Sequence, residues 1–172
     1  MRKLYWFALL FISINLSAQN DPEQKLKELQ IVLPEMSVPV ANYVKFVQSG
    51  KLLFLSGHGP RNAKGELITG RVGENLDIQQ GYDAAKACAI DLIATLKAAT
   101  GGDLRKVKRI VRVFGLVNST NSFTDQPKVL NGCSDLLVGV FGEKGRHVRT
   151  AVGANVLPNN IAVEVELIAE IE

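Results

Sequence analysis

Arg149 is the residue of this 172-residue chain whose neighbours most favour ligand binding. In the stretch 148–156, apolar residues occupy the even positions, while Arg149, Ala151 and Gly153 share the opposite face of a predicted strand. Because Ala151 and Gly153 are small, the guanidinium can occupy a hollow, where its planar fork would bind a carboxylate through two parallel hydrogen bonds. The alternative, which composition alone favours, is an arginine that simply faces water.

Glu164 is the second candidate. It lies in the stretch 161–172, which alternates again and places four glutamates, at 164, 166, 170 and 172, on one face. Such a row usually marks a face turned toward water or toward another subunit. A glutamate within hydrogen-bond reach of a water molecule can also orient it for attack or accept its proton. On the residues alone, a face turned toward water or another subunit is the favoured interpretation, as a water-facing side chain is for Arg149.

The histidines and cysteines predict no metal site. His58 and His147 each lack a second ligand at helix or strand spacing. Cys88 and Cys133 match no metal-binding motif, and each lies among apolar neighbours of a predicted helix. We therefore expect two small core residues; a disulfide is the less favoured alternative.

The amino terminus resembles an export signal. Arg2 and Lys3 precede an apolar run that ends near Leu16, and Ser17-Ala18 provides small residues at a cleavage site. The run is shorter than the roughly 20 residues that span a bilayer. We expect a signal peptide over 1–18, a charged lead-in over 19–39 and one domain over 40–172, exported to a periplasm or secreted without stable membrane insertion. An uncleaved anchor is the alternative.

The charge balance argues against a nucleic-acid partner. Of 20 basic and 17 acidic residues, the predicted leader removes two basic ones, which leaves a nearly neutral mature chain. The basic cluster between Arg105 and Arg112 has no aromatic residues interleaved for base stacking. A solvated strand entry is the interpretation that we favour.

The elements that must position Arg149 and Glu164 are predicted to be two adjacent strands. The strands 148–156 and 161–172 flank Leu157-Pro158-Asn159-Asn160, whose Pro and Asn residues suit a tight turn, so the pattern predicts a β-hairpin. In that register Arg149 lies opposite Ala169, and Glu164 lies opposite Ala154. Arg149 and Glu164 are then offset by about five residues along the hairpin, or about 17 Å at ~3.3 Å per residue. If both residues serve one site, one of them should come from a neighbouring subunit.

The remaining patterns predict an α+β fold. A hairpin over 43–57 ends in the glycine-rich Ser56-Gly57-His58-Gly59, and a short helix is expected in the lead-in. An apolar stripe predicts a helix over 77–100 with Asp77 as N-cap, and a second helix follows Asp125 and ends at Gly142. A run apolar on both faces predicts a central strand over 107–117. We expect a sheet with two helices on one face and a second face that needs a partner.

Several stretches together resemble the YjgF/RidA family, also called endoribonuclease L-PSP, and its longer subgroup in particular. They are LFLSGHGP, GYDAAKACAIDLIATLKAATG, VKRIVRVFGLVNS, VLNGCSDLL, FGEKGRHVRTAVG and LPNNIAVEVELIAEI, in that order from Val40 to the end of the chain. The resemblance implies a chorismate-mutase-like fold and a homotrimer with a ligand site in each cleft between subunits.

The resemblance also implies an activity and its residues. The activity is hydrolysis of imines or enamines such as 2-aminoacrylate to a keto acid and ammonia, without metal or organic cofactor. The family's carboxylate-binding arginine falls on Arg149 and its water-holding acid on Glu164, which makes these the candidate catalytic pair. The other substrate-binding positions fall on Tyr43, Ser56, Gly57 and Asn131. Ala151 replaces a cysteine that many members carry.

Two alternatives belong to other functional classes. A trimer that binds a small carboxylate without turnover, or protects other proteins, fits an exported chain better, because short-lived enamines arise in cytoplasmic metabolism. Ribonuclease activity rests only on the family's older name, and the nearly neutral charge and the lack of a histidine pair argue against it.

Overall fold

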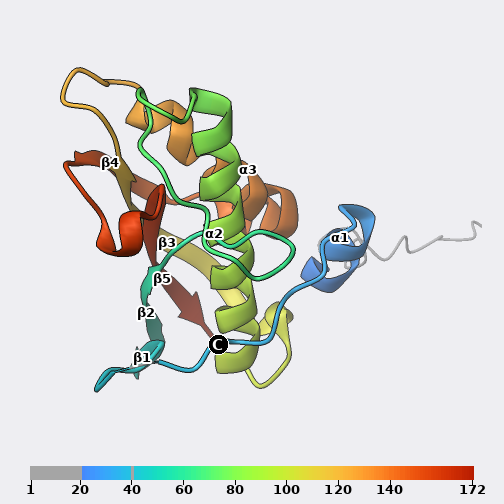
Figure 1. Cartoon of the computed structure of the whole chain (residues 1–172). Helices are drawn as coiled ribbons and strands as arrows, with labels where there is room; N and C mark the ends of the chain where they lie inside the picture. Colours follow the sequence, from blue (N-terminus) through green and yellow to red (C-terminus); the bar gives the residue numbers. More distant parts are fainter. Residues whose placement is uncertain (1–20, 40) are drawn as a thin grey trace, which may run out of the picture.

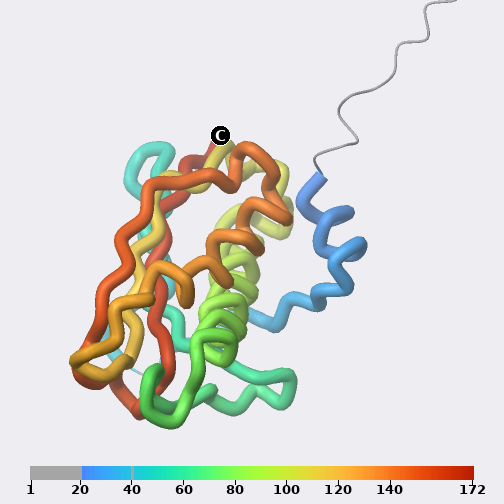
Figure 2. Tube along the Cα trace, turned by 90° about the horizontal axis from the view of Figure 1, so that it is seen from above, coloured from blue at the N-terminus to red at the C-terminus, as the bar shows by residue number. Residues whose placement is uncertain are grey.

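The computed structural model describes residues 21–39 and 41–172, so the predicted signal peptide lies outside the described residues. Five strands form one mixed sheet in the order β1-β2-β5-β3-β4. Figures 1 and 2 show α2 and α3 together on one face of this sheet. The elements are α1 (Pro22–Glu28), β1 (Phe46–Ser49), β2 (Leu52–His58), α2 (Ile78–Ala99), β3 (Val107–Asn118), α3 (Gln126–Phe141), β4 (Val148–Ala154) and β5 (Val163–Ile171). The predicted α+β class and the layer of two helices are confirmed.

The locally determined elements form where the sequence predicts them. β1 and β2 pair antiparallel as a hairpin. Asp77 caps α2 through a capping box in which its side chain accepts from the Gln80 backbone while the Gln80 side chain accepts from the Asp77 backbone N–H. α3 starts after Asp125, with Pro127 in its first turn, and ends at Gly142, whose φ of 59° suits glycine.

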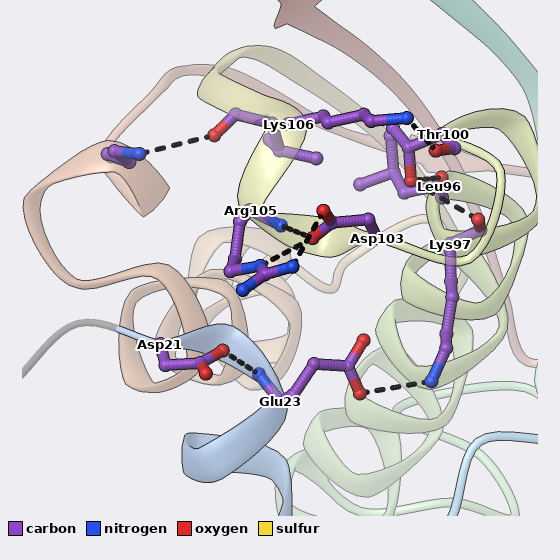
Figure 3. A network of polar contacts seen from close by, with 10 residues as sticks. Asp21, Glu23, Leu96, Lys97, Thr100, Asp103, Arg105 and Lys106 are labelled. Carbon is purple, nitrogen blue, oxygen red and sulfur yellow. Dashed lines mark hydrogen bonds and ion pairs between the residues drawn. The ribbon is translucent and has the colours of Figure 1, made fainter. Parts of the chain in front are cut away.

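The short helix α1 lies beside the helical layer, on the side away from the sheet (Figure 2). Asp21 caps it by accepting from the backbone of Glu23, and Leu26 is buried. Glu23 forms an ion pair of 3.0 Å with Lys97 near the end of α2, beside a fork between Arg105 and Asp103 (Figure 3). The Glu23–Lys97 ion pair and the buried Leu26 fasten the lead-in to the domain.

The predicted C-terminal hairpin is wrong. β4 and β5 run in opposite directions, as the turn at Pro158–Asn160 requires, but β3 lies between them. β3 pairs in parallel with β4 and antiparallel with β5. The side chain of Asn118, at the end of β3, donates to Asn160 Oδ1 and to the Ile161 carbonyl, which holds the crossing loop over the strand end. The five-residue offset calculated for adjacent strands therefore does not apply.

Arg149 lies on the face of the sheet that the helices cover, and not on a face turned to water, which composition alone favours. Arg149 pairs with Val113 and Ala151 with Gly115, and both partners face the helices. Val148 and Val152 instead point away from the helices and are 67% and 37% exposed. The small residues face inward because α3 lies so close to the sheet that a side chain at Gly115 would overlap Leu130.

The helix side of the sheet forms the core. Leu53, Val113, Val117, Val165 and Leu167 lie fully or almost fully buried against apolar residues of α2 and α3. Cys88 and Cys133 belong to this core as free thiols, as predicted. Burial raises the pKa of both thiols, that of Cys133 to about 12, so both are neutral.

Candidate functional site

Arg149 lies on the edge strand β4 and crosses onto α3. Its Nη1 donates to Asn131 Oδ1 at 3.0 Å and to Ser134 Oγ at 3.0 Å. Its Nη2 donates to the carbonyl oxygen of Pro127 at 3.3 Å. Asn131 and Ser134 are three residues apart and therefore lie on the same side of the helix. The structure thus brings together two of the predicted site residues, Arg149 and Asn131.

These bonds leave one edge of the guanidinium free. An arginine has five N–H groups, and three of those of Arg149 donate within the described chain. The two that remain belong to Nε and Nη2, the nitrogens with which arginine binds a carboxylate through two parallel bonds. Within residues 21–39 and 41–172, the guanidinium is thus anchored by three hydrogen bonds, and one N–H on Nε and one on Nη2 have no acceptor.

Ser134 and His147 are members of this cluster that the sequence did not reveal. His147 Nε2 lies 3.1 Å from Ser134 Oγ, and His147 Nδ1 lies 2.6 Å from the carbonyl oxygen of Gly145. Burial lowers the pKa of His147, and the charge of Arg149 lowers it further. The available signals were the helical spacing of Asn131 and Ser134 and the two-residue spacing of His147 and Arg149.

A second cluster surrounds Glu164 on the helix-free face. Glu164 pairs with Leu116 across the sheet, and a side chain at Gly57 would overlap Glu164 Oε1. The carboxyl is half-buried, and this burial raises its pKa; the charge of Glu166 acts in the same direction. Gly57 is thus required for the glutamate to lie against the strand. Gly57 and Glu164 are brought together, while Ser56, the preceding residue of β2, donates its hydroxyl proton to the carbonyl oxygen of Lys45 at 3.3 Å.

His58 supports this second cluster from the helix side. It is 4% exposed, and its Nδ1 lies 2.7 Å from the carbonyl oxygen of Ser56. Burial lowers the pKa of His58 to about 4, so the ring is neutral at pH 7. A carbonyl only accepts, so Nδ1 carries the proton. Nε2 lies 2.9 Å from Thr95 Oγ1, whose hydroxyl donates to the carbonyl oxygen of Asp91 at 3.1 Å.

Tyr43 joins neither cluster. It precedes β1 and is 49% exposed, and it lines a hollow of about 490 Å³ together with residues 36, 38–39, 41 and 44–46. β1 and β4 are the opposite edges of the sheet, which separates Tyr43 from Arg149 by the full width of the sheet.

The Arg149 cluster and the Glu164 cluster cannot form one site within a single chain. Arg149 pairs with Val113, and Glu164 pairs with Leu116 on the other side of the same strand β3. The two residues are thus two strands and three residues apart, or about 14 Å at ~4.8 Å per strand and ~3.3 Å per residue. Their side chains also point to opposite faces of the sheet, because side chains alternate along a strand.

The helix-free face is apolar and hollowed. Val47, Phe54 and Val148 are more than 40% exposed on it. A hollow of about 450 Å³ lies among Phe46, Phe54, Ser56, Arg112, Phe114 and Ile168. An exposed apolar patch of this kind is typical of an interaction surface.

The described residues contain neither a metal-ligand group nor a membrane-spanning helix. Within 21–39 and 41–172, no group of three or more His, Cys, Asp or Glu side chains is placed to share a metal ion. In the same ranges, no helix combines the length and the hydropathy that a membrane span requires.

Comparison with known proteins identifies the family. Residues 23–171 match the model of the family described as YjgF/chorismate mutase-like, "putative endoribonuclease". The chain is 46% identical over 147 residues to Protein TCP17 of Trypanosoma cruzi, covering 85% of this chain and 91% of the relative.

Two solved structures share this fold. One is the protein Atu1372 from Agrobacterium tumefaciens, of unknown function, with 43% identity, a TM-score of 0.81 and coverage of 88% of this chain and 94% of that one. The other is a Shewanella oneidensis protein described with the same endoribonuclease term, with 37% identity, a TM-score of 0.84 and coverage of 88% and 100%. The chain therefore belongs to the YjgF/chorismate-mutase-like family and has its fold.

Proposed function

We propose that this protein hydrolyses carboxylate-bearing imines or enamines to a keto acid and ammonia, at sites between the subunits of a homotrimer. The observation that carries the proposal is the arrangement of Arg149, which is anchored by Asn131, Ser134 and Pro127 while its carboxylate-binding edge stays free. A small ligand with a carboxylate next to the reacting carbon matches that edge.

Glu164 supplies the second function that such a reaction needs. Its burial raises the pKa of the carboxyl toward neutrality, which makes its carboxylate a better proton acceptor. An enamine first becomes its imine by taking a proton at carbon. Glu164 then accepts one proton from a water whose oxygen bonds to the carbon of the protonated imine, and the C=N π pair moves to nitrogen to give a carbinolamine. Glu164 passes its proton to this nitrogen, and the C–N bond breaks to release ammonia as the hydroxyl loses its remaining proton to solvent and becomes the C=O of the keto acid.

The site must be assembled across subunits, because Arg149 and Glu164 lie on opposite faces of one sheet. We propose that the helix-free face of one subunit, with Ser56, Gly57 and Glu164, lies against the β4 edge of the next. The exposed apolar residues of that face support such an interface. Tyr43 would enter the same cleft from the segment before β1.

A coupled assay tests the proposed activity. An amino-acid oxidase or lyase generates the imine in situ, and keto-acid formation is followed for the wild type, Arg149→Ala and Arg149→Lys. Lysine keeps the charge but not the planar fork, so we expect both variants to lose most of the acceleration. Arg146→Ala is the matched control, because Arg146 is an exposed arginine three residues away that pairs with Glu143. Equal activity in all four proteins refutes the proposal.

Carboxylate binding without turnover is the second candidate. The predicted export signal favours it, because export removes the chain from the cytoplasmic enzymes that release enamines. Pyruvate binding that depends on Arg149, combined with no acceleration of imine hydrolysis, would select this function. We propose a periplasmic or secreted location in either case.

A further inference from the structure

Arg149, Ser134, His147 and Gly145 form a hydrogen-bonded chain whose directions can be assigned. The Gly145 carbonyl only accepts, so His147 Nδ1, 2.6 Å away, carries a proton. The ring is neutral above its lowered pKa, so Nε2 is an acceptor and takes the hydroxyl proton of Ser134, at 3.1 Å. The lone pairs of Ser134 Oγ are then free to accept from Arg149 Nη1, at 3.0 Å.

Gly145, the last member of this hydrogen-bonded series, is held in place by packing. Gly145 is buried, and a side chain there would overlap the backbone of Leu137 and Val138 in α3. The carbonyl that orients His147 is therefore held against the same helix that carries Ser134 and Asn131. Every link of the chain thus leads back to α3, and the ring cannot turn without breaking a bond.

We propose that Ser134 and His147 are positioning residues for Arg149: they hold its Nη1 so that the Nε and Nη2 edge faces a bound carboxylate. The inference rests on the proposed carboxylate site. With Ser134 oriented by His147, both Nη1 protons have acceptors, one on Ser134 and one on Asn131. Without the Ser134 acceptor, the long arginine side chain gains alternative rotamers, and ligand binding has to select one of them.

The same atoms do not make a nucleophile. A serine and a histidine in contact can attack an acyl group when backbone N–H donors stabilise the oxyanion. Ser134 lies in the middle of α3, where the backbone N–H groups already bond within the helix, and its oxygen accepts from Arg149. The geometry therefore points to orientation of the guanidinium.

Paired variants of equal shape test the inference. Ser134→Thr keeps the hydroxyl. Ser134→Val has the same shape as Ser134→Thr but carries a methyl group in place of that hydroxyl. His147→Gln keeps an acceptor that can reach Ser134, and His147→Leu removes it. For each variant we would measure the Kd of pyruvate by calorimetry, KM and kcat in the coupled assay, and the thermal midpoint, with Arg149→Ala and Arg146→Ala alongside.

We expect Ser134→Val and His147→Leu to raise Kd and KM about tenfold, the loss of one hydrogen bond to a charged group, while kcat changes little. Ser134→Thr and His147→Gln should stay within about twofold of the wild type. In the Arg149→Ala background, Ser134→Val should have no further effect on pyruvate binding, because the residues act as one unit. If Ser134 and His147 were only structural, their variants would lower the thermal midpoint. They would not raise KM at constant kcat, and their effects on binding would not depend on Arg149.

The results distinguish the carboxylate site at Arg149 from the positioning role of Ser134 and His147. If Arg149→Ala binds pyruvate as well as the wild type does, the proposed carboxylate site is wrong. If Arg149→Ala weakens pyruvate binding while Ser134→Val and His147→Leu bind like the wild type, the carboxylate site stands and the positioning inference is overturned. Equal losses in Ser134→Thr and Ser134→Val would also overturn it, because the hydroxyl would then not matter.

Discussion

Mixing two inactive variants tests whether Arg149 and Glu164 meet between subunits. Arg149→Ala removes the carboxylate-binding edge, and Glu164→Ala removes the group proposed to activate water. Each variant alone should be nearly inactive. In a ring of identical subunits, every interface takes the β4 edge from one chain and the helix-free face from the next. A mixed trimer can then combine an intact arginine with an intact glutamate.

The expected recovery follows from the opposite faces of the two residues in the sheet. With random exchange at equal amounts, an interface has both residues intact when a Glu164→Ala chain supplies the edge and an Arg149→Ala chain supplies the face. That combination is one of four, so about one quarter of the wild-type activity should return. Recovery should fall symmetrically as the mixing ratio departs from equality.

The assay is keto-acid formation before and after subunit exchange, with exchange monitored by native mass spectrometry of chains that carry different mass tags. The control mixes Arg149→Ala with the double variant Arg149→Ala/Glu164→Ala, which should regain nothing. Confirmed mixed trimers that stay inactive would refute the reasoning, because a site within one chain never regains both residues.

Other predictions concern packing, titration, assembly and processing. Gly57→Ala should displace Glu164 and lower activity more than stability, as kcat and the thermal midpoint would show. Because the pKa of His58 falls from ~6.5 unfolded to about 4 folded, its contribution to stability is complete above pH 6.5 and decreases toward pH 4; denaturation at pH 5 should show a loss of about 2 kcal/mol that His58→Gln lacks. Light scattering should give a trimer for the wild type and smaller species for Phe54→Asp, and a monomeric wild type would contradict the proposed assembly. The mature protein should begin near Gln19 by intact mass.

Elements formed by local interactions followed the sequence closely. The boundaries of α2 were predictable because Asp77 and Gln80 satisfy the first backbone groups of the helix and Gly101-Gly102 ends it. The hairpin of β1 and β2 was predictable because two residues connect its strands. The buried cysteines followed from the apolar stripes of their helices. The family fold was predictable from the order of six stretches, and the comparisons confirm it.

Strand partners and side-chain environments depended on contacts between distant parts of the chain. Alternation assigned Arg149 and Glu164 to strands, but a period of two is the same whichever strand lies beside it, so it could not reveal that β3 separates β4 from β5. Nor could it show that Arg149 faces α3 while Glu164 faces away.

The hydrogen-bonded chain through Ser134 and His147 could not be predicted from the sequence either. Ser134 lies 13 positions from His147 and 15 from Arg149, and the three residues meet only where β4 lies against α3. The residue types and their local spacing determined which side chains can do chemistry. Non-local pairing of strands and helices decided which of them meet within the chain and which lie on opposite faces of its sheet.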